Sequence, residues 1–155
     1  MGTVEASEFE RLYAGRLCSL LSWEQLAQFW QRLLATADQG WYLYAIGEPP
    51  PLSAASGTAV GEFVSRVDAL LRREHRETYC GIVYTDDIER PSFVKIYDPN
   101  HLGSSCGSRK QALLPGWTMS RVPPVDLRPT QAAPEGRRRW WQDFLSRPSP
   151  LIREN

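Results

Sequence analysis

The 155-residue chain is long enough for one domain with a substantial core, and its 42% hydrophobic and 23% charged residues are typical of globular proteins. This composition excludes a chain that is mostly disordered or fibrous. The net charge is zero but unevenly spread, because residues 1–62 carry seven acids against three arginines and residues 91–155 carry ten basic residues against five acids. This imbalance is too weak to predict nucleic-acid binding.

Three features of the sequence bear on location and cofactors. The first residues lack the basic and apolar regions of a secretory signal. The longest apolar run, residues 41–46, is far too short to span a membrane, so we expect no integral membrane association. The three cysteines include no CxxC pair, which disfavours both disulfides and a zinc site. We therefore expect a cytoplasmic protein without a metal or another cofactor.

The N-terminal half predicts three helices. Capping-box patterns at residues 7–10 and 22–25 begin the first two, and each is followed by apolar residues at helical spacing, up to Leu21 in the first and Ala37 in the second. A third helix is expected over residues 57–71, where apolar residues again recur at helical spacing.

Four short aromatic and β-branched runs predict strands, at residues 41–46, 78–85, 92–97 and 117–122. The order α-α-β-α-β-β-β predicts a small α+β fold, with a mixed, mainly antiparallel sheet of three to four strands packed by three helices. The β-α-β unit is compatible with a parallel pair. We divide the chain into an α+β domain at 1–122, a Pro-rich linker at 123–136 and an extended basic, Trp-containing tail at 137–155.

The segment 98–115 is predicted to be a long loop, and loops of this length inside compact domains are commonly functional. Small residues in its middle precede two cations, and backbone N–H groups in such a run can hold an anion. The candidate ligand-binding residues are Asp98, Asn100, Ser104, Ser105, Arg109 and Lys110. Because the segment lacks Walker-loop spacing, a plain connector is the alternative interpretation.

Cys106 in the same loop is the candidate nucleophile, because the neighbouring Arg109 and Lys110 favour a thiolate. His101, five residues earlier, is the candidate general base, and the two form the candidate catalytic pair. The chain contains neither a His-Glu-x-x-His nor a Gly-x-Gly-x-x-Gly pattern, so no metalloprotease or dinucleotide-binding signature supports an enzyme.

The tail begins with a candidate short helix, in which three arginines precede two tryptophans and the apolar residues share one face. Tryptophan and arginine are favoured as interface anchors, so the candidate partner-binding residues are Arg138, Arg139, Trp140, Trp141 and Phe144. Two alternatives stay open: the tail folds back onto the acidic N-terminal half, or it lies on an anionic membrane surface.

The leading functional hypothesis is a non-catalytic cytoplasmic accessory or adaptor protein that binds another protein through the 98–115 loop and the tail. A thiol-dependent enzyme or redox protein that uses Cys106 is one alternative. A sensor of small anions or nucleotides, built on the Gly/Ser-rich part of the loop, is the other. A homodimer is compatible with each of these hypotheses, and none of them involves nucleic acid.

Overall fold

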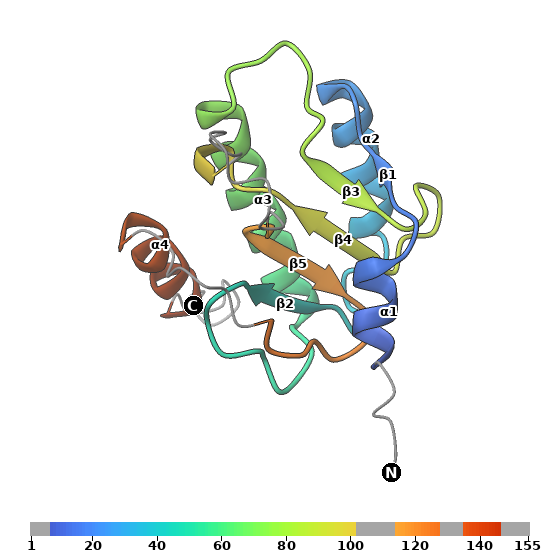
Figure 1. Ribbon diagram of the computed structural model, residues 1–155, viewed down its shortest axis with the longest axis vertical. Coiled ribbons are helices and arrows are strands. Elements are labelled where there is room, and N and C mark those ends of the chain that lie inside the picture. Colours follow the sequence, from blue (N-terminus) through green and yellow to red (C-terminus); the bar gives the residue numbers. More distant parts are fainter. Residues whose placement is uncertain (1–6, 102–113, 128–134, 147–155) are drawn as a thin grey trace, which may run out of the picture.

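The computed structural model describes residues 7–101, 114–127 and 135–146 (Figure 1). Within these ranges the elements, in chain order, are α1 (Glu8–Ala14), β1 (Cys18–Ser19), α2 (Trp23–Leu34), β2 (Tyr42–Ala45), α3 (Gly57–Glu74), β3 (Val83–Thr85), β4 (Phe93–Ile96), the 3-10 helix η1 (Pro99–His101), β5 (Trp117–Ser120) and α4 (Glu135–Ser146). The predicted small α+β class is confirmed.

The five strands of the described ranges form one antiparallel sheet with the order β1-β3-β4-β5-β2. The prediction of a mixed sheet with three to four strands is therefore wrong. The parallel pair suggested by the β2-α3-β3 unit is absent, because β4 and β5 lie between β2 and β3. Since β3, β4 and β5 pair with one another in chain order and β1 occupies the outer edge of β3, the free edge of β5 is the position left for β2.

The first helix is shorter than predicted. Ser7 caps α1 through the expected capping box, in which its hydroxyl accepts from the Glu10 N–H and the Glu10 carboxylate accepts from the Ser7 N–H. The helix ends at Ala14, and the residues assigned to its continuation include β1, where Cys18 lies opposite Thr85 of β3. Pairing with a strand distant in the sequence overrides the local helical spacing here.

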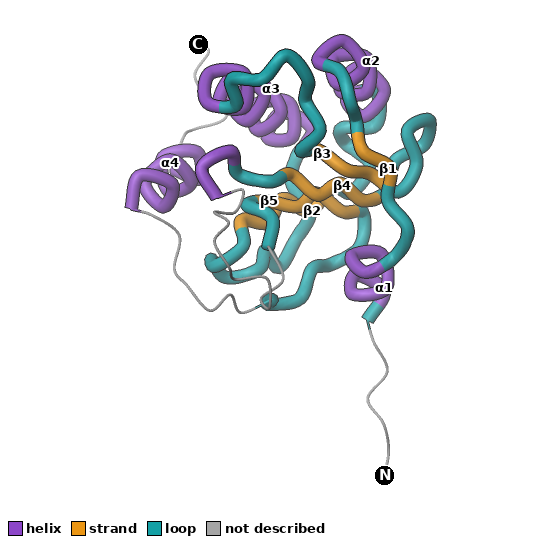
Figure 2. The backbone as a smooth tube through the Cα atoms, turned by 45° about the horizontal axis from the view of Figure 1, so that its top comes forward, coloured by secondary structure: helices purple, strands orange, loops and turns teal. Residues whose placement is uncertain are grey.

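Helices α2 and α3 cover one face of the sheet and α1 covers the other, as Figure 2 shows. The main core lies under α2 and α3, where Phe29, Phe63 and Val94 are completely buried. A smaller core lies under α1, where the rings of Phe9 and Phe93 meet edge to face at 5.6 Å. Strands β2, β4 and β5 therefore have two buried sides along much of their length. The edge strand β1 differs, because its Cys18 is exposed.

Helix α4 lies beside α3 and joins the main core (Figures 1 and 2). Its Trp141 and Phe144 are buried, and their ring centroids lie 6.2 and 5.8 Å from that of Phe63 in α3. The candidate short helix at the start of the tail is therefore confirmed, but the tail is not extended at these residues. Four helices are described where three were expected to pack against the sheet. The apolar helix face that was read as a partner-binding surface is instead covered within the chain itself.

Candidate functional site

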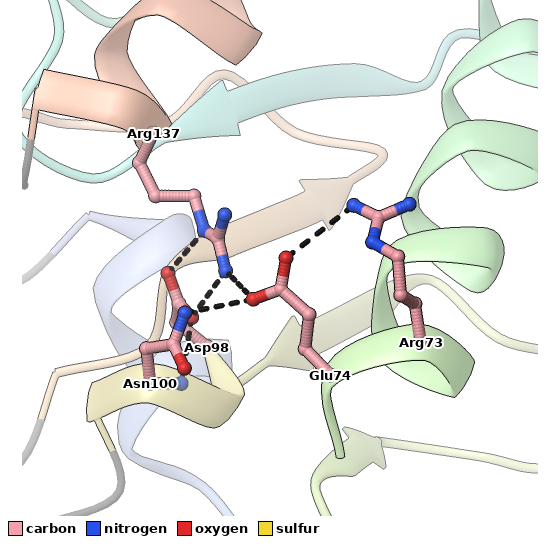
Figure 3. A network of polar contacts seen from close by, with 5 residues as sticks. All are labelled: Arg73, Glu74, Asp98, Asn100 and Arg137. Carbon is pink, nitrogen blue, oxygen red and sulfur yellow. Dashed lines mark hydrogen bonds and ion pairs between the residues drawn. The ribbon is translucent and has the colours of Figure 1, made fainter. Parts of the chain in front are cut away.

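The two segments that the sequence singled out meet in the fold. Strand β4 leads into η1, which begins the 98–115 segment, and the first turn of α4 lies against it (Figure 3). Asp98 and Asn100, two of the candidate ligand-binding residues, are at this junction. The side chain of His101 lies outside the described part of the structure, as do the candidate residues Ser104, Ser105, Cys106, Arg109 and Lys110.

Asp98 shapes the turn that follows β4. Its Oδ1 accepts a hydrogen bond of 2.9 Å from the Asn100 N–H, the local bond that makes aspartate common in turns. The Asp98 side chain is only 7% exposed. The amide of Asn100 donates to Oε1 of Glu74 at 2.7 Å, so the turn is tied to the last residue of α3.

Arg137 of α4 holds both carboxylates (Figure 3). Its Nε donates to Asp98 Oδ2 at 2.7 Å, and its Nη2 donates to Asp98 Oδ1 at 3.1 Å and to Glu74 Oε1 at 2.6 Å. Arg73 adds a bond of 3.3 Å to the other oxygen of Glu74. We call Arg73, Glu74, Asp98, Asn100 and Arg137 the Arg137 cluster.

The charges of the Arg137 cluster balance one another. Burial raises the pKa of Glu74, but the hydrogen bonds and charge of Arg137, helped by bonds from Arg73 and Asn100, outweigh it and lower the pKa overall. Burial lowers the pKa of Arg137, but the hydrogen bonds and charges of Asp98 and Glu74 outweigh burial and raise the pKa overall. Because two carboxylates face two guanidinium groups, the cluster suits a joint between α3, η1 and α4 better than a site for an ionic ligand.

The inward side of α4 continues from this joint into the core. Arg137, Trp140, Trp141 and Phe144 occupy positions i, i+3, i+4 and i+7, which lie on one side of a helix. Trp140 is half-buried, with its ring centroid 5.4 Å from that of Trp117 in β5. Sequence reasoning named the three aromatic residues but missed Arg137, although the same helical spacing would have placed it on their side.

The outward side of α4 carries the other two candidate partner-binding residues. Arg138 and Arg139 are exposed, and Nε of Arg138 lies 3.9 Å from Oε2 of Glu48, in the loop after β2. On the flank of the helix, Asp143 accepts a bond of 2.8 Å from Arg66 of α3. The position of α4 agrees with the interpretation in which this part of the tail folds back onto the body of the protein.

The sequence analysis did not consider one pattern in the 98–115 segment. Residues 103–107 read Gly-Ser-Ser-Cys-Gly, which fits the Gly-x-Ser-x-Gly pattern of serine hydrolases with Ser105 in the nucleophile position. That pattern requires a strand that runs directly into the serine. Here β4 ends at Ile96, and η1 follows before the chain leaves the described residues. Ser105 and the residues directly before it lie outside the described residues, so the structure does not test this pattern.

Other chemistry is sparse in the described ranges. Cys80 is fully buried, its pKa is raised by that burial, and its backbone oxygen lies 2.9 Å from Nε2 of His75. Within residues 7–101, 114–127 and 135–146, no three or more His, Cys, Asp or Glu side chains are grouped to hold a metal ion. In the same ranges no helix has both the length and the apolar character needed to cross a membrane.

Comparisons of the chain with models of protein families, with curated proteins and with solved structures gave no match. The arguments for function therefore start from the chain's own residues.

Proposed function

We propose that the protein binds another protein through one surface, formed by the outward side of α4 together with η1. The observation that carries this proposal is the bridge from Arg137 to Asp98, which fixes the start of the 98–115 segment beside the first turn of α4. Trp141 and Phe144 support this surface from beneath rather than contact the partner, because both are buried.

The outward side of α4 combines positive charge with an apolar anchor. Arg138, Gln142 and Leu145 occupy positions i, i+4 and i+7 of the helix, and all three are exposed. Leu145 is 58% exposed, although it is a large apolar residue. Arginine is enriched in interfaces, and a helix that is already folded loses little entropy on binding. These features support a partner that presents acidic groups around an apolar side chain.

The cysteines support a cytoplasmic setting for this proposal. Cys18 is exposed, and both Cys18 and Cys80 are free thiols. Exposed free thiols are usual where the surroundings are reducing and oxidise readily where they are not.

Site-specific photocrosslinking in the source cells tests the proposal. A photoreactive amino acid replaces Gln142 on the outward side of α4, and in the matched control it replaces Gln28, an exposed glutamine of α2. We expect a crosslinked protein of defined mass from position 142 that position 28 does not give. The double charge reversal Arg138→Glu and Arg139→Glu should abolish this crosslink while circular dichroism shows an unchanged fold.

Two results would contradict the proposal. The same crosslinked species from both positions would show that contact is not specific to α4. A specific crosslink that survives the charge reversal would show that the two arginines do not contribute to binding, and it would contradict a partner with acidic groups.

A further inference from the structure

The sheet face under α1 holds a row of polar side chains at its centre. Lys95 of the central strand β4 lies opposite Tyr84 of β3 and opposite Thr118 of β5. Its neighbours Val94 and Ile96 belong to the main core, so the alternation of a strand directs Lys95 to the opposite face. Thr118 is directed the same way, because Trp117 and Met119 belong to the main core.

The ammonium group of Lys95 has no anionic partner among the described residues. Its Nζ lies over the ring of Tyr13 in α1, 3.9 Å from the ring centroid. Lys95 is half-buried, and burial lowers its pKa. A partly desolvated cation without a counter-charge is unfavourable, and proteins usually pair such a group.

Tyr13 contacts this cation, and the ring of Tyr97 lies 5.7 Å from that of Tyr84, the residue opposite Lys95 in the sheet. Burial is the main cause that raises the pKa of Tyr13 to about 12, and the neighbouring Tyr97 and Tyr44 add to the effect. Burial and the nearby Tyr84 raise the pKa of Tyr97. No hydrogen bond joins the hydroxyls of Tyr13, Tyr84 and Tyr97 to another described residue.

Thr118 gives a second indication of a binding site, independent of the charge of Lys95. The residue is completely buried, and its Oγ1 has no hydrogen-bond partner. It sits between Lys95 on β4 and Tyr44 on β2, directly opposite each of them in the sheet. Buried hydroxyls without a partner are rare in native proteins and call for an explanation. A ligand with several oxygen atoms on this face would supply partners for the ammonium and for this hydroxyl.

We propose that a small molecule bearing a carboxylate or a phosphate binds on this face, with Lys95 as its charge partner and the hydroxyls of Thr118 and the tyrosines as donors. The site is separate from the outward side of α4, so either proposal can fail without the other. The carboxylate and phosphate alternatives share one chemistry, that of an oxyanion, and the experiment below separates them.

The lysine content of the chain makes a direct test simple. Lys95 and Lys110 are its two lysines, so labelling with lysine carrying carbon-13 at Cε gives two side-chain signals. Inorganic phosphate and sodium benzoate are titrated separately into the full chain at constant ionic strength, with sodium chloride as the reference. We expect the Lys95 signal to shift saturably with one of the two anions. The pKa of Lys95, followed through the same signal, should rise when that anion is bound, because an anion stabilises the ammonium form.

The signal of Lys110 and one variant serve as controls. Thr118→Val keeps the shape of the side chain and removes the hydroxyl, so it should fold with undiminished stability yet bind the anion about tenfold more weakly. Saturation by phosphate alone identifies a phosphate-bearing ligand, and saturation by benzoate alone a carboxylate. The proposal is overturned by the absence of a saturable shift with either anion, by equal shifts at both lysines, or by full affinity in Thr118→Val.

Discussion

Replacing Arg137 with methionine removes the guanidinium from the Arg137 cluster and keeps most of the alkyl chain. The change leaves the Asp98 carboxylate, 7% exposed, and the Glu74 carboxylate, 22% exposed, without their main cationic partner. Asn100 still donates to Glu74, and Arg73 still contacts it, so part of the compensation survives. The loss of stability should therefore lie between that of a buried and that of an exposed ion pair.

The magnitude follows from these two limits. Removing one partner of a fully buried pair costs about 3–5 kcal/mol, and an exposed pair contributes about 0–1 kcal/mol. We expect Arg137→Met to lower the free energy of unfolding by about 2–3 kcal/mol, and the melting temperature by roughly 5–10 °C for a chain of this size. The matched control is Arg138→Met on the same helix, because its side chain is 58% exposed and its nearest carboxylate contact is 3.9 Å long. This control should cost less than about 0.5 kcal/mol.

Urea unfolding of both variants and the parent at several pH values measures these differences. Folding lowers the pKa of Glu74, so the ionised carboxylate stabilises the folded state. This contribution to stability is present above the unfolded-state pKa, about 4.3, and is lost as the pH falls through the folded-state pKa. The gap between the parent and Arg137→Met should therefore be largest near neutral pH and shrink below about pH 4. Equal destabilisation by the two substitutions, or a gap that does not change with pH, would refute the role given to the cluster.

Three further predictions concern single side chains. Trp141→Ala should lower the free energy of unfolding by about 3 kcal/mol because the ring is buried, whereas Leu145→Ala on the outward side should cost less than about 0.5 kcal/mol, both measured by denaturant unfolding. Tyr13→Phe should reduce the loss of stability between pH 10 and about 12, since the folded state resists ionisation of this phenol; thermal melts across that range, with tyrosinate absorbance as a monitor, check it. Gly81→Ala should cost about 1–2 kcal/mol by the same unfolding assay, because φ is +69° there and an added Cβ would lie 3.3 Å from the ring of Tyr79.

The sequence predicted what is decided locally. The capping boxes at Ser7 and Ser22 depend on residues three apart, and both serines cap helices as expected. It did not predict β1, because two residues carry no periodic signal and pair only after β3 is in place. The sequence did not predict the strand order either, because the pairing of β2 with β5 joins segments more than seventy residues apart.

The candidate site residues also divide into those that local sequence marks and those that only the fold brings together. The sequence marked Asp98 by turn chemistry and the α4 aromatics by composition, but it did not indicate that Arg137 would join them. The apolar residues of α4 were read as a surface for another molecule, because a short amphipathic helix has the same pattern whether its partner is another chain or its own. The fold decides the matter by placing α3 within reach of Trp141.

Among the described residues, the buried side-chain atoms without a hydrogen-bond partner are Nη1 of Arg66 in α3, on the main-core side of the sheet, and Oγ1 of Thr118 on the α1 side. On the main-core side, the buried indole of Trp41 donates to Thr36 and that of Trp30 donates to Asp68. On the α1 side, Lys95 and the hydroxyl of Thr118 remain without hydrogen-bond partners among the described residues. Unsatisfied groups lower stability, and natural proteins keep them mainly where function requires them. Valine has nearly the shape of threonine and would leave no hydroxyl unsatisfied, so a ligand that contacts the Thr118 hydroxyl would account for a threonine at this position.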